Sequence, residues 1–464
     1  MQLTVHGAAR NVTGSKHVLQ VGKQRVLLDC GLFQGHRAES ERRNRNLPFD
    51  PRSIDAVLLS HAHVDHCGSL PTLVKHGFDG KVFCTRATAD LAEILLRDSA
   101  HVQRQDLEYL NKRRRKRGEV ALEPVYTEED VERTLPRFAP VDYDARTPVV
   151  PGVEATFREA GHILGSAVLE IAARERGASG TIVFTGDLGR SGMPILRDPY
   201  QPREADVLIT ESTYGGRTHG PAGRVEDDLA AFVRKTVRMK GKIVVPSFAV
   251  GRTQRIVYTL HGLMNSGRIP EVPIFVDSPL AVRATRIFRE HRECYDDEMR
   301  ELLRGGDDPL GFSRLTYVED VKESKKLNGM PGPAIIISAS GMCEAGRVLH
   351  HLANNIGRRR NAVMLVGFQA AHTLGRRIAD GERYVKILGK VHSVRARVAV
   401  FEEFSAHADR DGLLAFAEGM RRPPGRTVVV HGNEEQSLAL GRALTERGFS
   451  NVVVPLDGES IRLP

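Results

Sequence analysis

LLSHAHVDHCGSL, residues 58–70, places three histidines and one aspartate within six residues. They are His61, His63, Asp65 and His66. The apolar run before them, residues 54–59, predicts a strand, and the apolar residues after them have the spacing of a helix. The four side chains are therefore expected on a turn that joins a strand to a helix.

This cluster predicts a metal site. His61 and His63 are alternate residues and can point the same way, whereas Asp65 and His66 open the following helix and face a second position. Neutral imidazole and carboxylate at this density suit Zn²⁺ or a similar divalent ion. A lone histidine is usually a surface residue or a satisfied core residue, but four such side chains in six positions are hard to explain in that way.

Two ligands per metal are too few, and further polar side chains follow other apolar runs. They are Asp29 in VLLDCG, His162 in ATFREAGH, Asp187 in TIVFTGD, Glu211 in VLITE, His431 in VVVHG and, slightly later, His407 in VAVFEEFSAH. Polar side chains at strand ends on one edge of a sheet converge where α/β proteins usually have their sites. We therefore expect these residues to complete the site.

Composition excludes several classes of protein. The chain has 464 residues, 41% hydrophobic and 27% charged, as expected of a globular protein with two domains. Its apolar runs are shorter than the roughly 18 residues that a membrane span needs, and the N-terminus lacks the layout of a signal peptide. The five cysteines are scattered, which argues against a disulfide framework and favours the cytoplasm.

The charge balance favours a polyanionic partner. The net charge is +9, and the densest basic run is KRRRKR, Lys112 to Arg117. Two interpretations of this run stay open: a solvated helix end, or a patch that follows phosphates.

The arrangement of short apolar runs predicts an α/β protein with an inserted domain. Residues 1–211 contain many short strands, interrupted from about residue 88 to 131 by a helical segment. Residues 212–379 repeat a pattern of strand, tight turn and helix, which predicts a parallel, doubly wound sheet. In residues 380–464, RARVAVF and TVVVHG return to the style of the first region. We therefore expect residues 212–379 to be a domain inserted late in the chain of another.

The motifs resemble those of the metallo-β-lactamase superfamily, and specifically its β-CASP branch of nucleic-acid-processing enzymes. H-x-H-x-D-H, residues 61–66, is typical of the superfamily, and TESTYG, FSAHAD and VHGNEEQ follow in the order of the β-CASP branch. The stretches SAHVQRQDLEYLN, PSFAVGRTQ and SASGMCEAGR are similar to bacterial and archaeal relatives of the nuclease subunit of the cleavage and polyadenylation specificity factor. The resemblance implies an αββα sandwich with an inserted β-CASP domain.

The resemblance also implies a zinc-dependent ribonuclease that cuts single-stranded RNA by a two-metal hydroxide mechanism, as an endonuclease with 5′-to-3′ exonuclease action as a second mode. One Zn²⁺ would be held by His61, His63 and His162, a second by Asp65, His66 and His431, and Asp187 would bridge both. Asp29 would orient a ligand or the metal-bound water, and His407 would be the general acid, held by Glu211. Candidate phosphate contacts are Ser247, Arg252, Arg255, Ser340 and Arg347.

Three alternatives stay open. A small-molecule hydrolase of the lactonase or thioesterase type would share the zinc ligands, but it would not require the inserted domain, Glu211 or His407. A DNA nuclease is disfavoured by His431, because DNA-processing members of the branch tend to lack that histidine. A binding module with structural zinc would not need seven ligands around two ions. A homodimer is common among similar proteins, and we expect neither an N-terminal RNA-binding extension nor the C-terminal domain of ribonuclease J.

Overall fold

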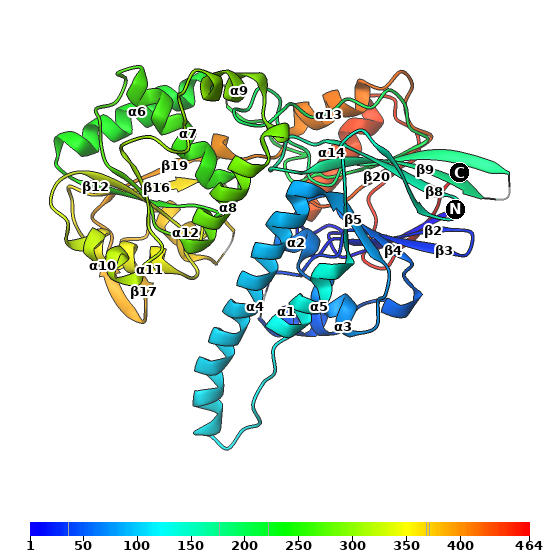
Figure 1. Cartoon of the computed structure of the whole chain (residues 1–464), viewed down its shortest axis with the longest axis horizontal. Coiled ribbons are helices and arrows are strands. Elements are labelled where there is room, and N and C mark those ends of the chain that lie inside the picture. Colours follow the sequence, from blue (N-terminus) through cyan, green and yellow to red (C-terminus); the bar gives the residue numbers. More distant parts are fainter. Residues whose placement is uncertain (36, 176, 221, 368, 371) are drawn as a thin grey trace. The chain divides into compact units, whose positions relative to one another are not determined.

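The computed structural model describes residues 1–35, 37–175, 177–220, 222–367, 369–370 and 372–464. The chain forms two compact units (Figure 1). Unit 1 comprises Met1–Met193, Arg197–Thr218 and His407–Pro464, and unit 2 comprises Pro194–Leu196 and His219–Ala406. The predicted domain limits at residues 211 and 379 stay a prediction.

Unit 1 contains two seven-stranded mixed sheets. The first has the order β22 (Ser460–Arg462), β1 (Gln2–His6), β2 (Lys16–Val21), β3 (Gln24–Leu28), β4 (Ala56–Leu58), β5 (Lys81–Thr85), β6 (Phe138–Val141). The second has the order β21 (Val452–Val453), β20 (Arg426–Val429), β11 (Val207–Thr210), β10 (Ala178–Phe184), β9 (Ala167–Glu175), β8 (Val153–Glu159), β7 (Arg146–Val150). The short strands predicted for residues 1–211 are therefore present.

The inner faces of the two sheets pack against each other and form the core of unit 1. Along β8, Val153, Ala155 and Phe157 are buried and the residues between them are half-buried, as expected of a strand with one face in the core. They join one apolar cluster with Leu19 and Leu58 of the first sheet. The period-2 pattern of these strands therefore determines which side chains the sandwich encloses.

Helices cover the outer faces of the sandwich. α13 (Arg410–Glu418) and α14 (Glu434–Glu446) pack on the second sheet through an apolar cluster that includes Leu413, Leu440 and Val183. On the side of the first sheet lie α1 (Arg37–Arg45), α2 (Val64–Cys67), α3 (Leu70–Lys75), α4 (Arg86–Arg115) and α5 (Glu128–Thr134) (Figure 1). This is the expected αββα sandwich, and α4 and α5 are the predicted helical interruption.

Unit 2 is built on a six-stranded parallel sheet, as predicted. Its order is β14 (Leu315–Tyr317), β13 (Ile274–Val276), β15 (Ala334–Ser338), β12 (Lys242–Pro246), β16 (Ala362–Val366), β19 (Arg397–Phe401). Every residue of β12, β15 and β16 is buried, which explains their continuous apolar runs, because a parallel sheet is covered on both faces.

The other elements of unit 2 are helices and one hairpin. The helices are α6 (Ala222–Arg238), α7 (Arg252–Asn265), α8 (Pro279–Glu290), α9 (Asp297–Arg304), α10 (Val321–Gly329), α11 (Arg347–Asn355) and α12 (Leu374–Ala379). The hairpin consists of β17 (Tyr384–Ile387) and β18 (Lys390–Ser393). Among the described residues, none of the helices combines the length and the apolar character needed to cross a bilayer.

One sequence interpretation was wrong. The stretch RARVAVF forms β19, which pairs in parallel with β16 in the sheet of unit 2, with Met364 opposite Ala399. Its short apolar run suggested a strand of the first region. Such a run also suits an edge strand of the parallel sheet, where most residues of β19 are half-buried.

Candidate metal centre

The predicted site residues follow strand ends in unit 1. Each lies one to three positions after the last residue of its strand: Asp29 after β3, His61 after β4, His162 after β8, Asp187 after β10, Glu211 after β11 and His431 after β20. Because β3 with β4, and β10 with β11 and β20, run in parallel, their carboxyl ends share an edge of each sheet. This arrangement of the strands brings together side chains that lie far apart in the chain.

A close backbone contact fixes the turn that carries the histidine cluster. The amides of Cys30 and Leu32, after β3, donate to the carbonyl oxygens of His66 and Val64 in α2 over 2.6 and 2.8 Å. A Cβ at Gly31 would lie 1.5 Å from the carbonyl oxygen of Asp65. Only glycine therefore permits this packing, which positions α2 and its two candidate ligands against β3.

The first group of candidate ligands consists of His61, His63, His162 and Asp187, whose ligand atoms all lie within 4.8 Å of one another. His63 Nδ1 lies 3.2 Å from the Nε2 atoms of both His61 and His162. Asp187 Oδ2 lies 3.4 Å from Nε2 of His61 and 3.5 Å from Nε2 of His162. Three imidazoles and one carboxylate oxygen thus converge on one point.

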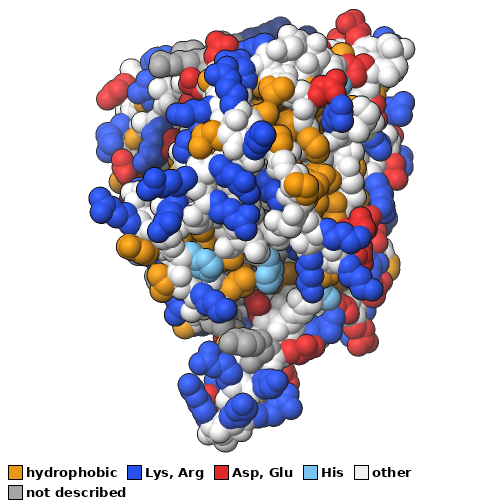
Figure 2. Space-filling view, turned by 90° about the vertical axis from the view of Figure 1, so that its left-hand side faces the viewer, with side chains coloured by type: hydrophobic (Ala, Val, Ile, Leu, Met, Phe, Trp, Pro, Cys, Tyr) orange, Lys and Arg blue, Asp and Glu red, His pale blue; other side chains and the backbone are white. Residues whose placement is uncertain are grey.

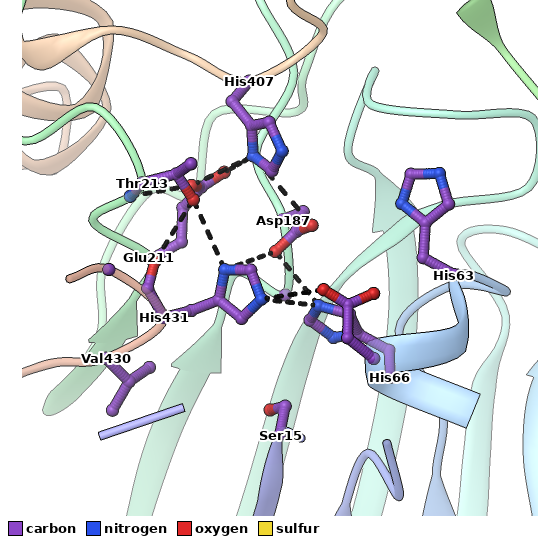
Figure 3. Close-up of polar contacts among 12 residues, drawn as sticks. Ser15, His63, His66, Asp187, Glu211, Thr213, His407, Val430 and His431 are labelled. Atoms are coloured by element: carbon purple, nitrogen blue, oxygen red, sulfur yellow. Dashed lines mark hydrogen bonds and ion pairs between the residues drawn. The ribbon is translucent and has the colours of Figure 1, made fainter. Parts of the chain in front are cut away.

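The second group consists of Asp65, His66 and His431. Nε2 of His66 and Nε2 of His431 lie 3.1 Å apart, and Asp65 Oδ2 lies 3.5 Å from Nε2 of His431. The other oxygen of Asp187, Oδ1, lies 3.3 Å from His66 Nε2 and 3.3 Å from His431 Nδ1. Figure 3 shows Asp187 between His407, His431 and His66. The two oxygens of one carboxylate therefore face the two groups.

The chemistry of these atoms fits bound cations. Asp187 Oδ1 is buried and accepts no hydrogen bond from the described residues, although a buried carboxylate oxygen normally has a donor. Burial lowers the pKa of His61 to about 3 and that of His63 to about 4, so both imidazoles are neutral and each has a lone pair for a metal ion. Neutral imidazole and carboxylate are preferred ligands of Zn²⁺.

Asp29 holds His66 in position. Its carboxylate is buried and accepts hydrogen bonds from His66 Nδ1 at 2.7 Å, Ser60 N at 2.7 Å and Ser60 Oγ at 2.8 Å. With its proton on Nδ1, His66 presents Nε2 to the second group. Burial favours neutral His66, but the charges of Asp187 and Asp29 outweigh it and raise its pKa well above the ordinary value. This part of the site therefore favours a positive charge.

His407 and Glu211 form a pair beside the ligand groups. His407 Nδ1 lies 3.1 and 3.2 Å from the two carboxylate oxygens of Glu211 (Figure 3). Glu211 is fully buried and accepts from the amides of Leu188, at 2.6 Å, and Thr213, at 3.2 Å. The side chain of His407 is 19% exposed, so it reaches solvent from a buried support.

The electrostatics of His407 differ from those of His61 and His63. Burial alone would lower its pKa, but the charges of Glu211 and then Asp187, together with the hydrogen bond to Glu211, raise the pKa to about 9. His407 lies outside the metal-binding groups that the described residues form. It can therefore carry a proton at neutral pH.

The sequence did not predict three hydroxyl side chains that hydrogen-bond to the site residues. Ser60 donates to Asp29, Ser166 Oγ accepts from the amides of His162 and Ile163 at 3.1 and 3.2 Å, and Thr213 Oγ donates to the carbonyl oxygen of His431 at 3.2 Å. Ser60 directly precedes His61, and Thr213 lies in TEST with Glu211. Those positions were the available signals, but hydroxyl residues are too common for position alone to identify them.

The candidate phosphate contacts all lie in unit 2. Ser247 follows β12 and Ser340 follows β15, and Ser247 N donates to the carbonyl oxygen of Ser338 over 3.1 Å. The structure therefore brings the two serine loops to the same edge of the parallel sheet.

The three arginines among these candidates already bond within the protein. Arg252 donates to the carbonyl oxygen of Val366 at 3.0 Å, and Arg255 to those of Ser405 and Glu403 at 3.3 and 3.2 Å. Arg347 donates to the Asp277 carboxylate at 2.6 Å. A phosphate would compete with these bonds, and the contacts stay a prediction.

Models of three protein families match the chain. The metallo-beta-lactamase superfamily matches residues 14–247, the Beta-Casp domain matches residues 253–378, and the Zn-dependent metallo-hydrolase RNA specificity domain matches residues 391–455. The first match includes six of the seven candidate metal ligands, and the third includes His407 and His431.

Two relatives and one solved structure illustrate the similarity. Ribonuclease TTHA0252 of Thermus thermophilus is 38% identical over 97% of both chains. Transcription termination factor FttA of Methanocaldococcus jannaschii is 30% identical over 98% of this chain and 71% of its own. A crystal structure of a protein of unknown function from Enterococcus faecalis has a TM-score of 0.54 and 13% identity over 99% of both chains, which is a similarity of fold alone.

Proposed function

The chain belongs to the metallo-β-lactamase superfamily and contains its Beta-Casp domain, and from this premise we propose that it is a zinc-dependent ribonuclease acting on single-stranded RNA. One observation carries the proposal: Asp187 faces two ligand groups through its two oxygens, with the Glu211–His407 pair beside it. The similarity to a ribonuclease over nearly the whole chain, and the match to an RNA specificity domain, support RNA as the substrate.

The proposal assigns two Zn²⁺ ions per chain. His61, His63 and His162 would hold one, Asp65, His66 and His431 would hold the other, and Asp187 would contact both. When bound, such a pair supplies Lewis acidity for a phosphate oxygen and activates water at neutral pH. Asp29 would keep His66 in the tautomer that presents Nε2 to the metal.

In this proposal His407 delivers the proton that the leaving ribose oxygen needs. Its Nδ1 faces Glu211, so the proton to be transferred is on Nε2. A pKa of about 9 keeps the ring protonated before the reaction, and the buried Glu211 carboxylate keeps it oriented. General acid catalysis of this kind typically contributes about 10²–10⁴-fold to the rate. Departure of the 3′-oxygen leaves a 5′-phosphate and a 3′-hydroxyl.

The finer parts of the proposal follow the same residues. We propose endonucleolytic cleavage, with 5′-to-3′ exonuclease action as a second mode, and RNA rather than DNA because His431 is present. The five cysteines are buried and form no disulfide, which supports a reducing compartment such as the cytoplasm. A homodimer stays a prediction that light scattering can test.

The test compares substrates and metal states. The zinc-loaded protein should cut labelled single-stranded RNA, a strong chelator should abolish cleavage, and added Zn²⁺ should restore it. Single-stranded DNA of the same sequence and a chromogenic lactam should remain intact. Hydrolysis of the lactam without cleavage of RNA would replace the proposal with a small-molecule hydrolase, and preferential cleavage of DNA would replace it with a DNA nuclease.

A further inference from the structure

The far part of α4 and the segment that returns from it form a projecting element of unit 1. We call residues 101–126 the arm. In Figure 1 this part of α4 extends beyond α1, α3 and α5, and the chain then runs back beside it. Most of its described residues are exposed or half-buried. Covering the sandwich therefore does not explain why the helix continues so far.

The returning segment is fastened to the helix by specific hydrogen bonds. The side-chain amide of Asn111 donates to the carbonyl oxygen of Leu122 and accepts from its backbone N–H, both at 2.8 Å. Val125 N donates to the side chain of Gln103 at 3.2 Å, and Tyr126 Oη donates to Ser99 Oγ at 2.7 Å. The arm is thus a built structure that holds its tip in place.

Ion pairs become sparse at the tip of α4. Nearer its start, Arg97 pairs with Glu93 and Glu132, and Arg104 pairs with Glu108 and Glu128. Residues 110–125 contain six Lys or Arg and only two Glu. Glu119 pairs with Arg114 at 3.0 Å and lies 4.0 Å from Arg117.

The remaining four cations are exposed and have no acidic partner within ion-pair distance among the described residues. They are Lys112, Arg113, Arg115 and Lys116. The lower end of the view in Figure 2, where the arm ends, is covered with Lys and Arg side chains.

A solvated helix end does not account for this density. Cations in the last helical turn interact favourably with the helix dipole, but Lys112 and Lys116 are also like charges four residues apart, which destabilise a helix by a few tenths of a kcal/mol. The negative charges of a polyanion that lies across the tip would offset the repulsion between Lys112 and Lys116. Regularly spaced phosphates are the polyanion that the proposed function supplies.

The helix that carries the arm, α4, starts against a loop of the candidate metal centre. The hydroxyl groups of Thr85 and Thr88, at the start of α4, donate to the carbonyl oxygen of Gly165 at 2.6 and 2.8 Å. Gly165 lies in the loop that carries His162. At 1.5 Å per helical residue, Lys112 lies about 40 Å along the helix from its start. One helix therefore links the loop of a metal ligand to the basic tip.

We propose that the tip of the arm binds the backbone of the RNA substrate at a second position, about 40 Å along α4 from the loop that carries His162. This rests on the proposed function. At 3.4 Å per stacked nucleotide, RNA of about a dozen nucleotides is needed to reach both positions. Lys112, Arg113, Arg115 and Lys116 then bind phosphates without base contacts, so the arm favours long substrates and is indifferent to sequence.

The test neutralises three tip cations in the full-length, zinc-loaded protein, as Arg113→Gln, Arg115→Gln and Lys116→Gln combined. The control, Lys322→Gln, Lys325→Gln and Lys326→Gln, removes the same charge from exposed positions on α10. Binding of a 25-nucleotide RNA is measured between 50 and 200 mM salt. The logarithm of the binding constant falls linearly with the logarithm of the salt concentration, and each lost phosphate contact makes that slope shallower by about 0.7. The slope of the arm variant should therefore be shallower by about 2. Between 50 and 200 mM salt, wild type should lose roughly 20-fold more affinity than the arm variant loses. The control should keep the wild-type slope.

Cleavage of a five-nucleotide RNA should be unchanged in the arm variant, which also shows that the variant is folded. An unchanged slope in the arm variant, an equal loss in the control, or slower cleavage of the short RNA would overturn the proposal. So would arm-dependent binding to phosphatidylserine vesicles with RNA binding unaffected. If wild type cuts no RNA of either length, the proposed function fails instead, and the binding series still decides whether the arm holds RNA.

Discussion

At the scale of single residues, the proposed function gives His407 and Asp187 different tasks although they lie 3.9 Å apart. Asp187 has both oxygens directed at candidate ligand groups, whereas His407 has its Nδ1 against Glu211. A ligand and a proton donor can therefore be separated by substitution, since only one of them should affect metal content.

His407→Ala should keep both zinc ions and the fold but cut RNA about 10²–10⁴-fold more slowly, because it removes a proton donor. Metal analysis, thermal unfolding and single-turnover cleavage on one preparation check this. His350→Ala, an exposed histidine on α11, is the matched control. Loss of zinc from the His407 variant would make His407 a ligand, and near-normal cleavage would reject its role as an acid.

His431→Ala should lower zinc content from about two ions per chain to about one, because the proposed function makes His431, with Asp65 and His66, a ligand of the second ion alone. Asp187→Asn should weaken both sites, since Asp187 faces both. Metal analysis after dialysis against a weak chelator separates the two outcomes. A wild-type protein with one tightly held metal, unchanged in the His431 variant, contradicts the assignment.

At the scale of elements, periodicity and strand ends predicted much of the fold and the site. The cluster after β4 was recognisable because several ligand-type side chains fall within one turn. The placement of β19 was not predictable, because its short apolar run suits a strand of either sheet. Ser60 and Thr213 were not predictable as support residues, because a hydroxyl group gains its role only from tertiary neighbours.

The end of β8 gives a prediction about pH. Burial raises the pKa of Glu159 to about 7, against the bond from Gly161 N and the charge of Arg197. The folded state therefore holds a proton that the unfolded state has lost between about pH 4.5 and 7, so stability falls as pH rises through this window. A shift of this size corresponds to about 3 kcal/mol.

Glu159→Gln should abolish the fall in stability with rising pH, because glutamine has no charge to bury. Denaturant unfolding of wild type and variant at pH 5 and pH 8 checks it, with metal-loaded protein in both cases. The variant should gain stability relative to wild type at pH 8 and show little difference at pH 5. If the difference in unfolding free energy between the two proteins is the same at pH 5 and at pH 8, Glu159 is ionised in the folded state at both pH values.

At the scale of the whole molecule, the candidate metal centre lies entirely within unit 1, although its residues come from positions 29 to 431. The main part of unit 2, His219–Ala406, is inserted between Glu211 and His407 in the chain, so the proposed acid and the carboxylate beside it lie on opposite sides of the insertion. The net charge of +9 favours association with a polyanion. We propose that this centre hydrolyses RNA with water as the nucleophile.

The most direct test of attack by water is to digest a defined single-stranded RNA and identify the ends of the products by mass spectrometry. With water as the nucleophile and His407 protonating the leaving 3′-oxygen, the fragments should carry a 5′-phosphate and a 3′-hydroxyl. RNA with a 2′-deoxy nucleotide at the scissile position should also be cut, because the 2′-hydroxyl takes no covalent part. A 2′,3′-cyclic phosphate on the products, or a 2′-deoxy substrate that binds but is not cut, would contradict attack by water and make the 2′-hydroxyl the nucleophile.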